Sequence, residues 1–135
     1  MARKDYNSQA ELKHALGALI CNLRKERKLS LRKFATAIGL SPSNVTYIEK
    51  GVNVPTAEVY IKAMDVLDPD SKLKKEMDDY YSLIRNTPPP DICKILLHNN
   101  DLYETLRLID NIDLTPQQLQ AIKDLFVSIN HSTPR

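Results

Sequence analysis

The chain has 135 residues, of which 42% are hydrophobic and 27% are charged. This length and balance describe one domain, or a small domain with an appendage, and exclude a large multi-domain enzyme and a disordered chain. With only 3 glycines, the chain contains neither of the glycine-rich phosphate-binding patterns G-x-G-x-x-G and G-x-x-x-x-G-K. No apolar run approaches the roughly 18 residues of a membrane span, and the charged beginning of the chain is followed by no apolar stretch typical of a secretory signal.

The charges are unevenly distributed along the chain. Residues 1–55 carry 10 Lys and Arg against 4 Asp and Glu, a net of +6, whereas residues 56–135 carry 9 against 13, a net of −4. A basic half joined to an acidic half predicts that only the first half faces a polyanion. The densest basic run, residues 24–28, is either part of that surface or an ordinary solvated helix face.

Apolar residues recur at helical spacing along the whole chain, and no segment alternates with a period of two, so we predict an all-α protein. A first helix of about five turns carries one apolar face. That face consists of Leu12, Leu16, Leu19, Ile20 and Leu23. Ser30 is expected to cap a second helix over 31–38 that ends at Gly39, and Ser41 with Pro42 begins a third helix.

The third helix is expected to run to about Glu49, and two more helices follow it. A fourth helix opens after Pro55 and breaks at Pro69, and a fifth carries its apolar residues over 73–84. The three prolines of 88–90 then predict a stiff, extended spacer, because they cannot continue a helix.

Two or three further amphipathic helices are predicted beyond these prolines. Residues 101–104 and 115–118 each resemble a capping box at a helix start. The domain organisation predicted from this pattern is a first domain over 1–87 and a small C-terminal helical segment over 91–135.

Residues 31–50 have the pattern of two short helices that cross at a tight turn. Such a crossing needs a small residue where the helices touch, a residue that tolerates positive φ at the turn, and apolar anchors on the second helix. Ala35, Gly39, Val45 and Ile48 meet these needs at suitable intervals. Phe34, Ile38 and Leu40 complete the small core.

On the basis of these residues, the stretch 16–67 resembles the lambda-repressor-like (Cro/repressor) helix-turn-helix family. The matching text covers 23–35, 38–45, 47–51 and 53–55, and it includes Glu49-Lys50-Gly51 and Asn53-Val54-Pro55. The resemblance implies a five-helix DNA-binding domain whose third helix, over 41–49, enters the major groove. Many proteins of this type come from bacteria and phages.

The resemblance also assigns the exposed side of the third helix to DNA recognition. The residues expected at the bases are Ser41, Ser43, Asn44, Thr46 and Tyr47. Those expected at phosphates are Arg32, Lys33, Lys50 and Asn53, beside the backbone amides at the starts of the second and third helices. An alternative role for Ser43 and Asn44 is to satisfy the helix N-terminus. Leu31 and Tyr47 differ from the glutamine and the smaller residue that many family members carry.

No pattern in the sequence indicates catalysis, a cofactor or a metal. The histidines, His14, His98 and His131, have no ligand spacing with one another or with Cys21 and Cys93. The two cysteines form no C-x-x-C and no disulfide framework, which is typical of a reducing, cytoplasmic compartment. We therefore expect a DNA-binding protein and not an enzyme.

One helix-turn-helix buries little surface on DNA, so we expect a homodimer that reads two operator half-sites about one turn apart. The main hypothesis is a sequence-specific transcriptional regulator, most simply a repressor, that dimerises through residues 91–135. An inducing protein is another partner considered for this segment, and packing of its helices on the first domain is a third interpretation. The alternatives are the antitoxin of a toxin–antitoxin pair, which would bind its toxin through the C-terminal helices, and an adaptor that contacts only proteins.

Overall fold

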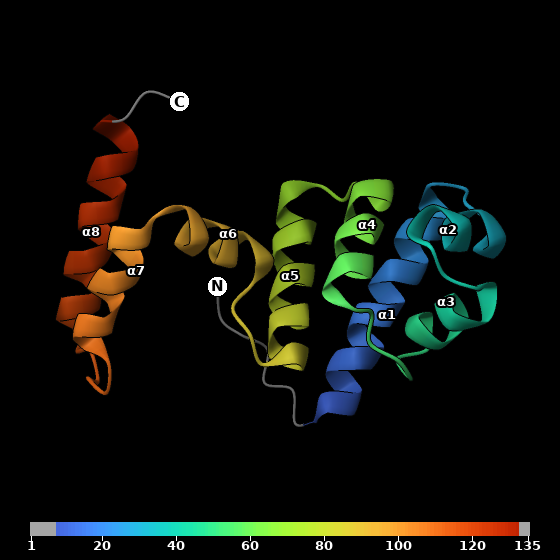
Figure 1. Ribbon diagram of the computed structural model, residues 1–135, viewed down its shortest axis with the longest axis horizontal. Helices are drawn as coiled ribbons and strands as arrows, with labels where there is room; N and C mark the ends of the chain where they lie inside the picture. Colours follow the sequence, from blue (N-terminus) through green and yellow to red (C-terminus); the bar gives the residue numbers. More distant parts are fainter. Residues whose placement is uncertain (1–7, 133–135) are drawn as a thin grey trace. The chain divides into compact units, whose positions relative to one another are not determined.

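The computed structural model describes residues 8–132, which form eight α-helices, one short 3-10 helix and no strand (Figure 1). The prediction of an all-α protein is therefore confirmed. The chain divides into two compact units, residues 1–95 and residues 96–135. No helix among the described residues is long and apolar enough to cross a membrane.

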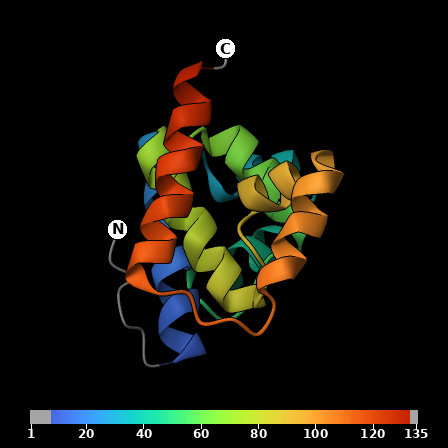
Figure 2. The same cartoon turned by 90° about the vertical axis from the view of Figure 1, so that its left-hand side faces the viewer.

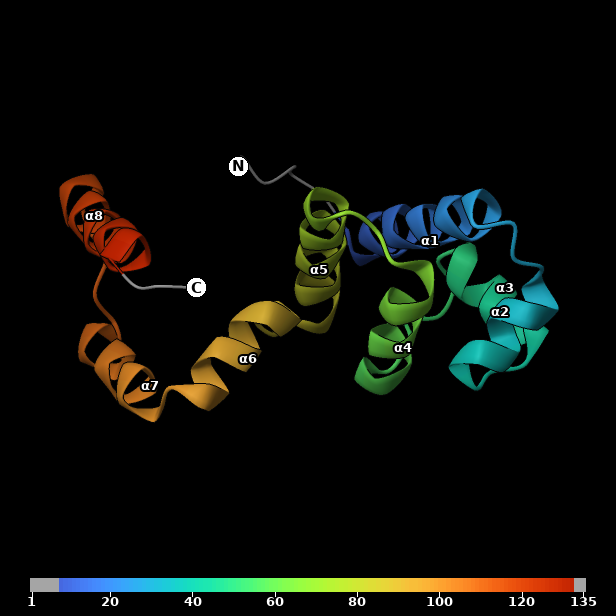
Figure 3. The same cartoon turned by 90° about the horizontal axis from the view of Figure 1, so that it is seen from above.

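Five packed helices make up most of the first unit. They are α1 (Gln9–Glu26), α2 (Leu31–Ile38), α3 (Pro42–Glu49), α4 (Ala57–Leu67) and α5 (Ser71–Arg85). Helix α1 packs against α3, α4 and α5, while α2 packs against α3 and α4 (Figures 1 and 3). This is the five-helix arrangement that the sequence predicts.

Side-chain caps begin the two helices of the predicted crossing. The Oγ of Ser30 accepts a hydrogen bond from the backbone N–H of Lys33 at 3.1 Å, and the Oγ of Ser41 accepts one from Asn44 at 3.2 Å. Gly39 ends α2 with φ of 76°, a conformation that a residue with a Cβ adopts only at a cost. The predicted caps and the turn are confirmed.

The core lies between these five helices. Its apolar side chains with the lowest exposure are Leu16, Ile20, Phe34, Ala35, Ile38, Val45, Tyr60, Leu67 and Met77. The rings of Tyr60 and Tyr81 stack with their centroids 4.1 Å apart. The Tyr60 hydroxyl donates to Asp78 at 2.6 Å, and the Lys74 ammonium donates to the other Asp78 oxygen at 2.9 Å. A satisfied polar network therefore joins α4 to α5 inside the core.

Helix α1 makes a close backbone approach to the end of α3 at Gly17. A Cβ on Gly17 would lie 2.4 Å from the carbonyl oxygen of Ile48 and 2.7 Å from that of Glu49. Gly51, at φ of 76°, is similarly close to α1, since a Cβ there would lie 2.7 Å from the Cα of His14. Two glycines thus allow α1 to contact the end of α3 directly.

The proline segment folds differently from the prediction. Pro88 and Pro89 lie between helices, but Pro90 is the first residue of α6 (Pro90–His98), so the three prolines do not form one extended spacer. Proline is well suited to the first helical position, because the N–H that it lacks would have no partner within the helix.

The second unit contains α7 (Asn100–Leu106), a 3-10 helix (Arg107–Ile109) and α8 (Pro116–Ser132), which is one uninterrupted helix (Figure 2). The capping box predicted at 101–104 is wrong, because α7 begins after Asn99 with no side-chain cap and Asp101 lies inside the helix. The box at 115–118 is confirmed. The Thr115 hydroxyl accepts from the Gln118 N–H at 3.1 Å, and the Gln118 side chain accepts from the Thr115 N–H at 2.9 Å.

Candidate nucleic-acid interface

Helix α3 has one apolar buried side and one polar exposed side. Val45 and Ile48 are buried in the core. The residues predicted to contact bases lie on the other side or at the cap: Ser41, Ser43, Asn44 and Tyr47 are exposed, and Thr46 is half-buried. The structure therefore places all the predicted base-contacting residues on one short element.

The hydrogen bonds of α3 separate these residues into two kinds. The Ser41 hydroxyl accepts from the Asn44 N–H, and the Thr46 hydroxyl donates to the Pro42 carbonyl at 3.1 Å. The capping role considered for Ser43 and Asn44 is thus filled by Ser41. Within residues 8–132, the side chains of Ser43 and Asn44 have no hydrogen-bond partner, so their polar groups are available to a ligand.

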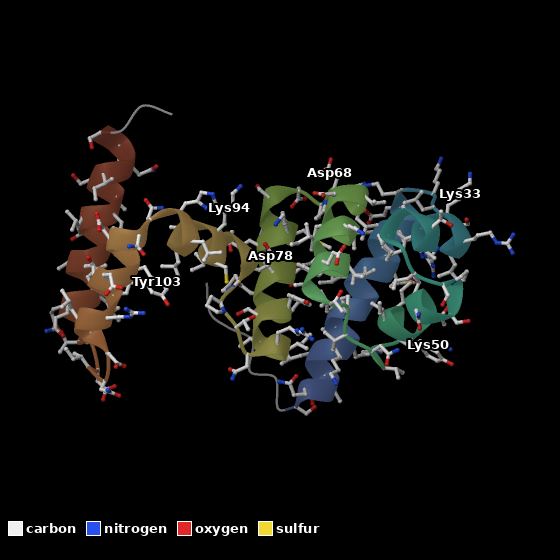
Figure 4. All side chains as sticks on the ribbon, viewed as in Figure 1. Lys33, Lys50, Asp68, Asp78, Lys94 and Tyr103 are labelled. Atoms are coloured by element: carbon white, nitrogen blue, oxygen red, sulfur yellow. The ribbon has the colours of Figure 1, made fainter. Side chains whose placement is uncertain are left out.

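Exposed positive charge surrounds this helix. Arg32 and Lys33 are exposed on α2, and Lys50 and Asn53 are exposed at and after the end of α3. Lys33 and Lys50 both lie on the side of the unit formed by α2 and α3 (Figure 4). Glu49 is the only acidic residue between positions 28 and 56.

Glu49 contributes no exposed negative charge, because it is bound to Arg24 of α1. The Arg24 Nε lies 2.8 Å from Oε2 of Glu49, its Nη2 lies 3.0 Å from Oε1, and its Nη1 donates to the Leu29 carbonyl at 2.8 Å. The two side chains are only 11% and 8% exposed. The hydrogen bond with Glu49 raises the pKa of Arg24, against the lowering effect of burial. The exposed charges of residues 28–56 are therefore all positive.

The basic run at 24–28 is not a uniform surface. Besides Arg24, Arg27 donates to the carbonyl oxygens of Leu67 at 2.8 Å and Asp68 at 2.9 Å, where α4 ends. These two arginines hold the fold together, and only Lys25 and Lys28 of the run's basic side chains remain exposed without such a role. The sequence alone allows residues 24–28 to be interpreted either as a solvated helix face or as part of a surface that faces a polyanion. Neither interpretation includes this structural function of Arg24 and Arg27.

A groove connects α3 with the segment that leads into α4. It has a volume of about 240 Å³, and Asn44 and Asn53 contribute polar groups to an otherwise mainly apolar lining. A predicted base-contacting residue and a predicted phosphate-contacting residue thus line one groove. Among the described residues, no group of three or more His, Cys, Asp or Glu could hold a metal ion.

Sequence reasoning did not find Gly17, Arg24 or Glu49 as residues that position α3. The sequence contained a local indication for two of these residues, Gly17 and Arg24. Gly17 interrupts the apolar pattern of a helix in which alanine would be more favourable, and Arg24 directly follows Leu23 at the edge of the buried stripe. Their partners lie about 25 residues or more away in sequence, and no local pattern identifies them.

A polar helix flanked by exposed positive charge and held across a tight two-helix turn on a five-helix core is typical of a DNA-binding helix-turn-helix domain. The family model described as Helix-turn-helix matches residues 22–68. This segment is a helix-turn-helix domain of the lambda-repressor-like family, a domain of DNA-binding transcriptional regulators.

No curated protein sequence matches the chain. Among solved structures, the clp gene regulator ClgR from Corynebacterium glutamicum is similar over 63% of this chain and 89% of that chain, with 23% sequence identity and a TM-score of 0.45.

Proposed function

We propose that this protein is a sequence-specific regulator of transcription that binds double-stranded operator DNA as a homodimer and acts as a repressor. The observation that carries the proposal is the exposed side of α3. Its polar side chains Ser43 and Asn44 have no hydrogen-bond partner in the described chain, and the exposed charges of residues 28–56 around them are all positive. This combination suits the floor of the major groove between two rows of phosphates.

In the proposed complex, helix 41–49 enters the major groove with its N-terminal end toward the bases. The Asn44 amide can form two hydrogen bonds with adenine, and the Ser43 hydroxyl can donate to or accept from several bases. Tyr47, which is 48% exposed, lies one turn further along α3. From there it would reach a base or the sugar–phosphate backbone.

Phosphate contacts are proposed on both sides of that helix. Arg32 and Lys33 would bind one backbone strand, and Lys50 and Asn53 the other. The N-terminal amides of α2 and α3 add partial positive charge at the same surface. These contacts fix the orientation of the domain, while the α3 side chains determine which sequence it prefers.

We assign DNA binding to a domain over residues 1–87 and dimerisation to residues 91–135. Apolar side chains are exposed on the helices of the latter segment, including Leu97, Leu108 and Leu125, and such exposure is typical of an interaction surface. A dimer on an operator that overlaps a promoter would exclude the polymerase.

In vitro selection tests the proposal directly. Full-length protein at near-physiological salt is incubated with random DNA fragments, and the bound pool is sequenced. We expect an enriched inverted repeat with half-sites about one turn apart. A double variant, Ser43→Ala with Asn44→Ala, serves as the matched comparison and should retain DNA binding but lose the enrichment. Folded wild-type protein that enriches no sequence would contradict the proposal and favour the adaptor or the antitoxin hypothesis.

A further inference from the structure

Helix α8 carries a regular apolar stripe that is exposed to solvent. Leu119, Ile122, Phe126 and Ile129 follow one another at intervals of three, four and three residues, which places them on one side of a helix. Leu119, Phe126 and Ile129 are 53%, 50% and 51% exposed, and Ile122 is half-buried. We refer to these four residues as the α8 stripe.

The second unit does not bury enough apolar surface to be stable by itself. Among its described residues, 96–132, none is buried. A unit of about 40 residues without disulfides or metal ordinarily depends on association with another surface. The α8 stripe therefore needs a covering surface in the folded protein.

We propose that the α8 stripe pairs with the same stripe of a second copy of this chain, in antiparallel orientation. The inference rests on the proposed function, since it identifies the surface through which the regulator dimerises. It goes further in specifying the element, the residues and their pairing.

The symmetry of the spacing is the first argument for a second copy. Intervals of three, four and three residues read the same in both directions along α8. Two antiparallel copies therefore bring Leu119 of one copy against Ile129 of the other, and Ile122 against Phe126. Each pair across the interface thus combines two different side chains, and the two Phe126 rings do not have to pack against each other.

Charge is the second argument. Within residues 116–132 the only Lys, Arg, Asp or Glu side chains are Lys123 and Asp124, so α8 is neutral overall. A strongly acidic or basic partner would find no complementary charge on this helix, whereas an identical helix meets no charge within the stripe. Lys123 is exposed beside the stripe, where solvent and salt weaken the repulsion between its two copies.

Sedimentation equilibrium of the full-length protein tests the inference, with a charge placed on the stripe or off it. Phe126→Glu should raise the dimer dissociation constant roughly 30-fold or more, the effect of losing a central apolar anchor. Val127→Glu is the matched control, because Val127 is the next residue, is 46% exposed and lies off the stripe. This variant should dimerise like the wild type. A monomeric wild-type protein, or equal effects of the two substitutions, would overturn the inference.

Cross-linking tests the orientation. In a background with Cys21→Ala and Cys93→Ala, a mixture of Leu119→Cys and Ile129→Cys chains should form mixed disulfide dimers more readily than either variant alone. Predominant linkage of Leu119→Cys to itself would overturn the antiparallel pairing.

DNA binding separates this inference from the proposed function. If the α8 pairing is wrong, Phe126→Glu leaves the oligomeric state unchanged while the protein still binds the selected operator. If the proposed function is wrong, the protein dimerises through α8 but enriches no DNA sequence.

Discussion

Arg24 on α1 and Glu49 at the end of α3 are joined by three charged hydrogen bonds, of 2.8 Å, 3.0 Å and 3.3 Å. Both side chains are almost completely buried, so the pair fixes the end of α3 against α1. It also removes the one carboxylate of residues 28–56 from the exposed charge around Lys50. Attachment of α3 and the sign of its surface charge thus depend on the same two residues.

Replacing Arg24 with alanine should destabilise the first unit by about 3 kcal/mol, because Glu49 would remain buried without its partner. Chemical denaturation followed by circular dichroism measures the change. Lys25→Ala is the matched control on the next residue, which is exposed, and it should alter stability by no more than about 0.5 kcal/mol. Equal denaturation midpoints for the two variants would show that the ion pair contributes no stability.

Replacing Gly17 with alanine tests the close approach of α1 and α3, because an exposed helix and a close contact predict changes in stability of opposite sign. In an exposed helix this substitution stabilises by roughly 0.5–1 kcal/mol. Here the new Cβ would lie 2.4 Å from the Ile48 carbonyl oxygen, so we expect a loss of about 1–3 kcal/mol from overpacking. A rise in melting temperature would show that the two helices can separate at no cost.

Replacing Asn44 with alanine should weaken binding to the selected operator by about 1–3 kcal/mol, the contribution of a bidentate base contact. Fluorescence anisotropy with operator and with unrelated DNA measures the two affinities. Non-specific binding and the melting temperature should stay nearly the same, because the Asn44 side chain is exposed. Asn22→Ala, an exposed asparagine on α1, is the control. An unchanged operator affinity in Asn44→Ala would mean that another part of the surface reads the bases.

Replacing Lys50 with alanine should weaken binding to all DNA sequences to a similar degree. Loss of one phosphate contact should reduce the slope of log affinity against log salt by about one. Titrations at several salt concentrations measure that slope. Lys72→Ala removes an exposed lysine from α5 and should leave it unchanged. Identical slopes for the two variants would exclude Lys50 from the proposed phosphate contacts.

The buried Tyr60 hydroxyl predicts a loss of stability in alkali. Burial, together with the hydrogen bond to Asp78, raises the pKa of Tyr60 well above its ordinary 10.0. The folded state holds this proton more tightly than the unfolded state. Its contribution to stability is therefore complete below about pH 10 and declines as the pH rises further.

Urea denaturation between about pH 8 and pH 11 tests this dependence. Tyr60→Phe should lower stability at pH 8, because Asp78 loses a hydrogen-bond donor, and should reduce the decline above about pH 10. Burial also raises the pKa of Tyr81, so some decline should remain. The same pH slope in wild type and variant would exclude Tyr60 as its source.

The parts of the fold that could be predicted depend on interactions between near neighbours. Ser30 and Ser41 cap helices through N–H groups three residues away, and Gly39 turns the chain by its own φ. The error at Pro90 has a local cause as well. Proline is compatible both with a spacer and with a first helical turn, and its own sequence context does not decide between them.

The residues that could not be predicted act over long separations. The carboxylate that binds Arg24 lies 25 residues away, and Arg27 bonds to a carbonyl 40 residues away. A basic run looks the same in sequence whether its side chains face solvent, DNA or a buried acid. For the α3 surface, the resemblance to the helix-turn-helix family predicted the exposed residues, while the residues that support the helix became visible only in the packed structure.

The side chains that anchor α3 are different from those that we propose to contact DNA. Val45, Ile48 and Glu49 hold the helix, whereas Ser43 and Asn44 make no side-chain hydrogen bond within the described chain. Substitutions at these two positions should therefore cost no more than about 0.5 kcal/mol of stability. A lineage of such proteins could exchange one target sequence for another by successive point mutations, and each intermediate would still fold.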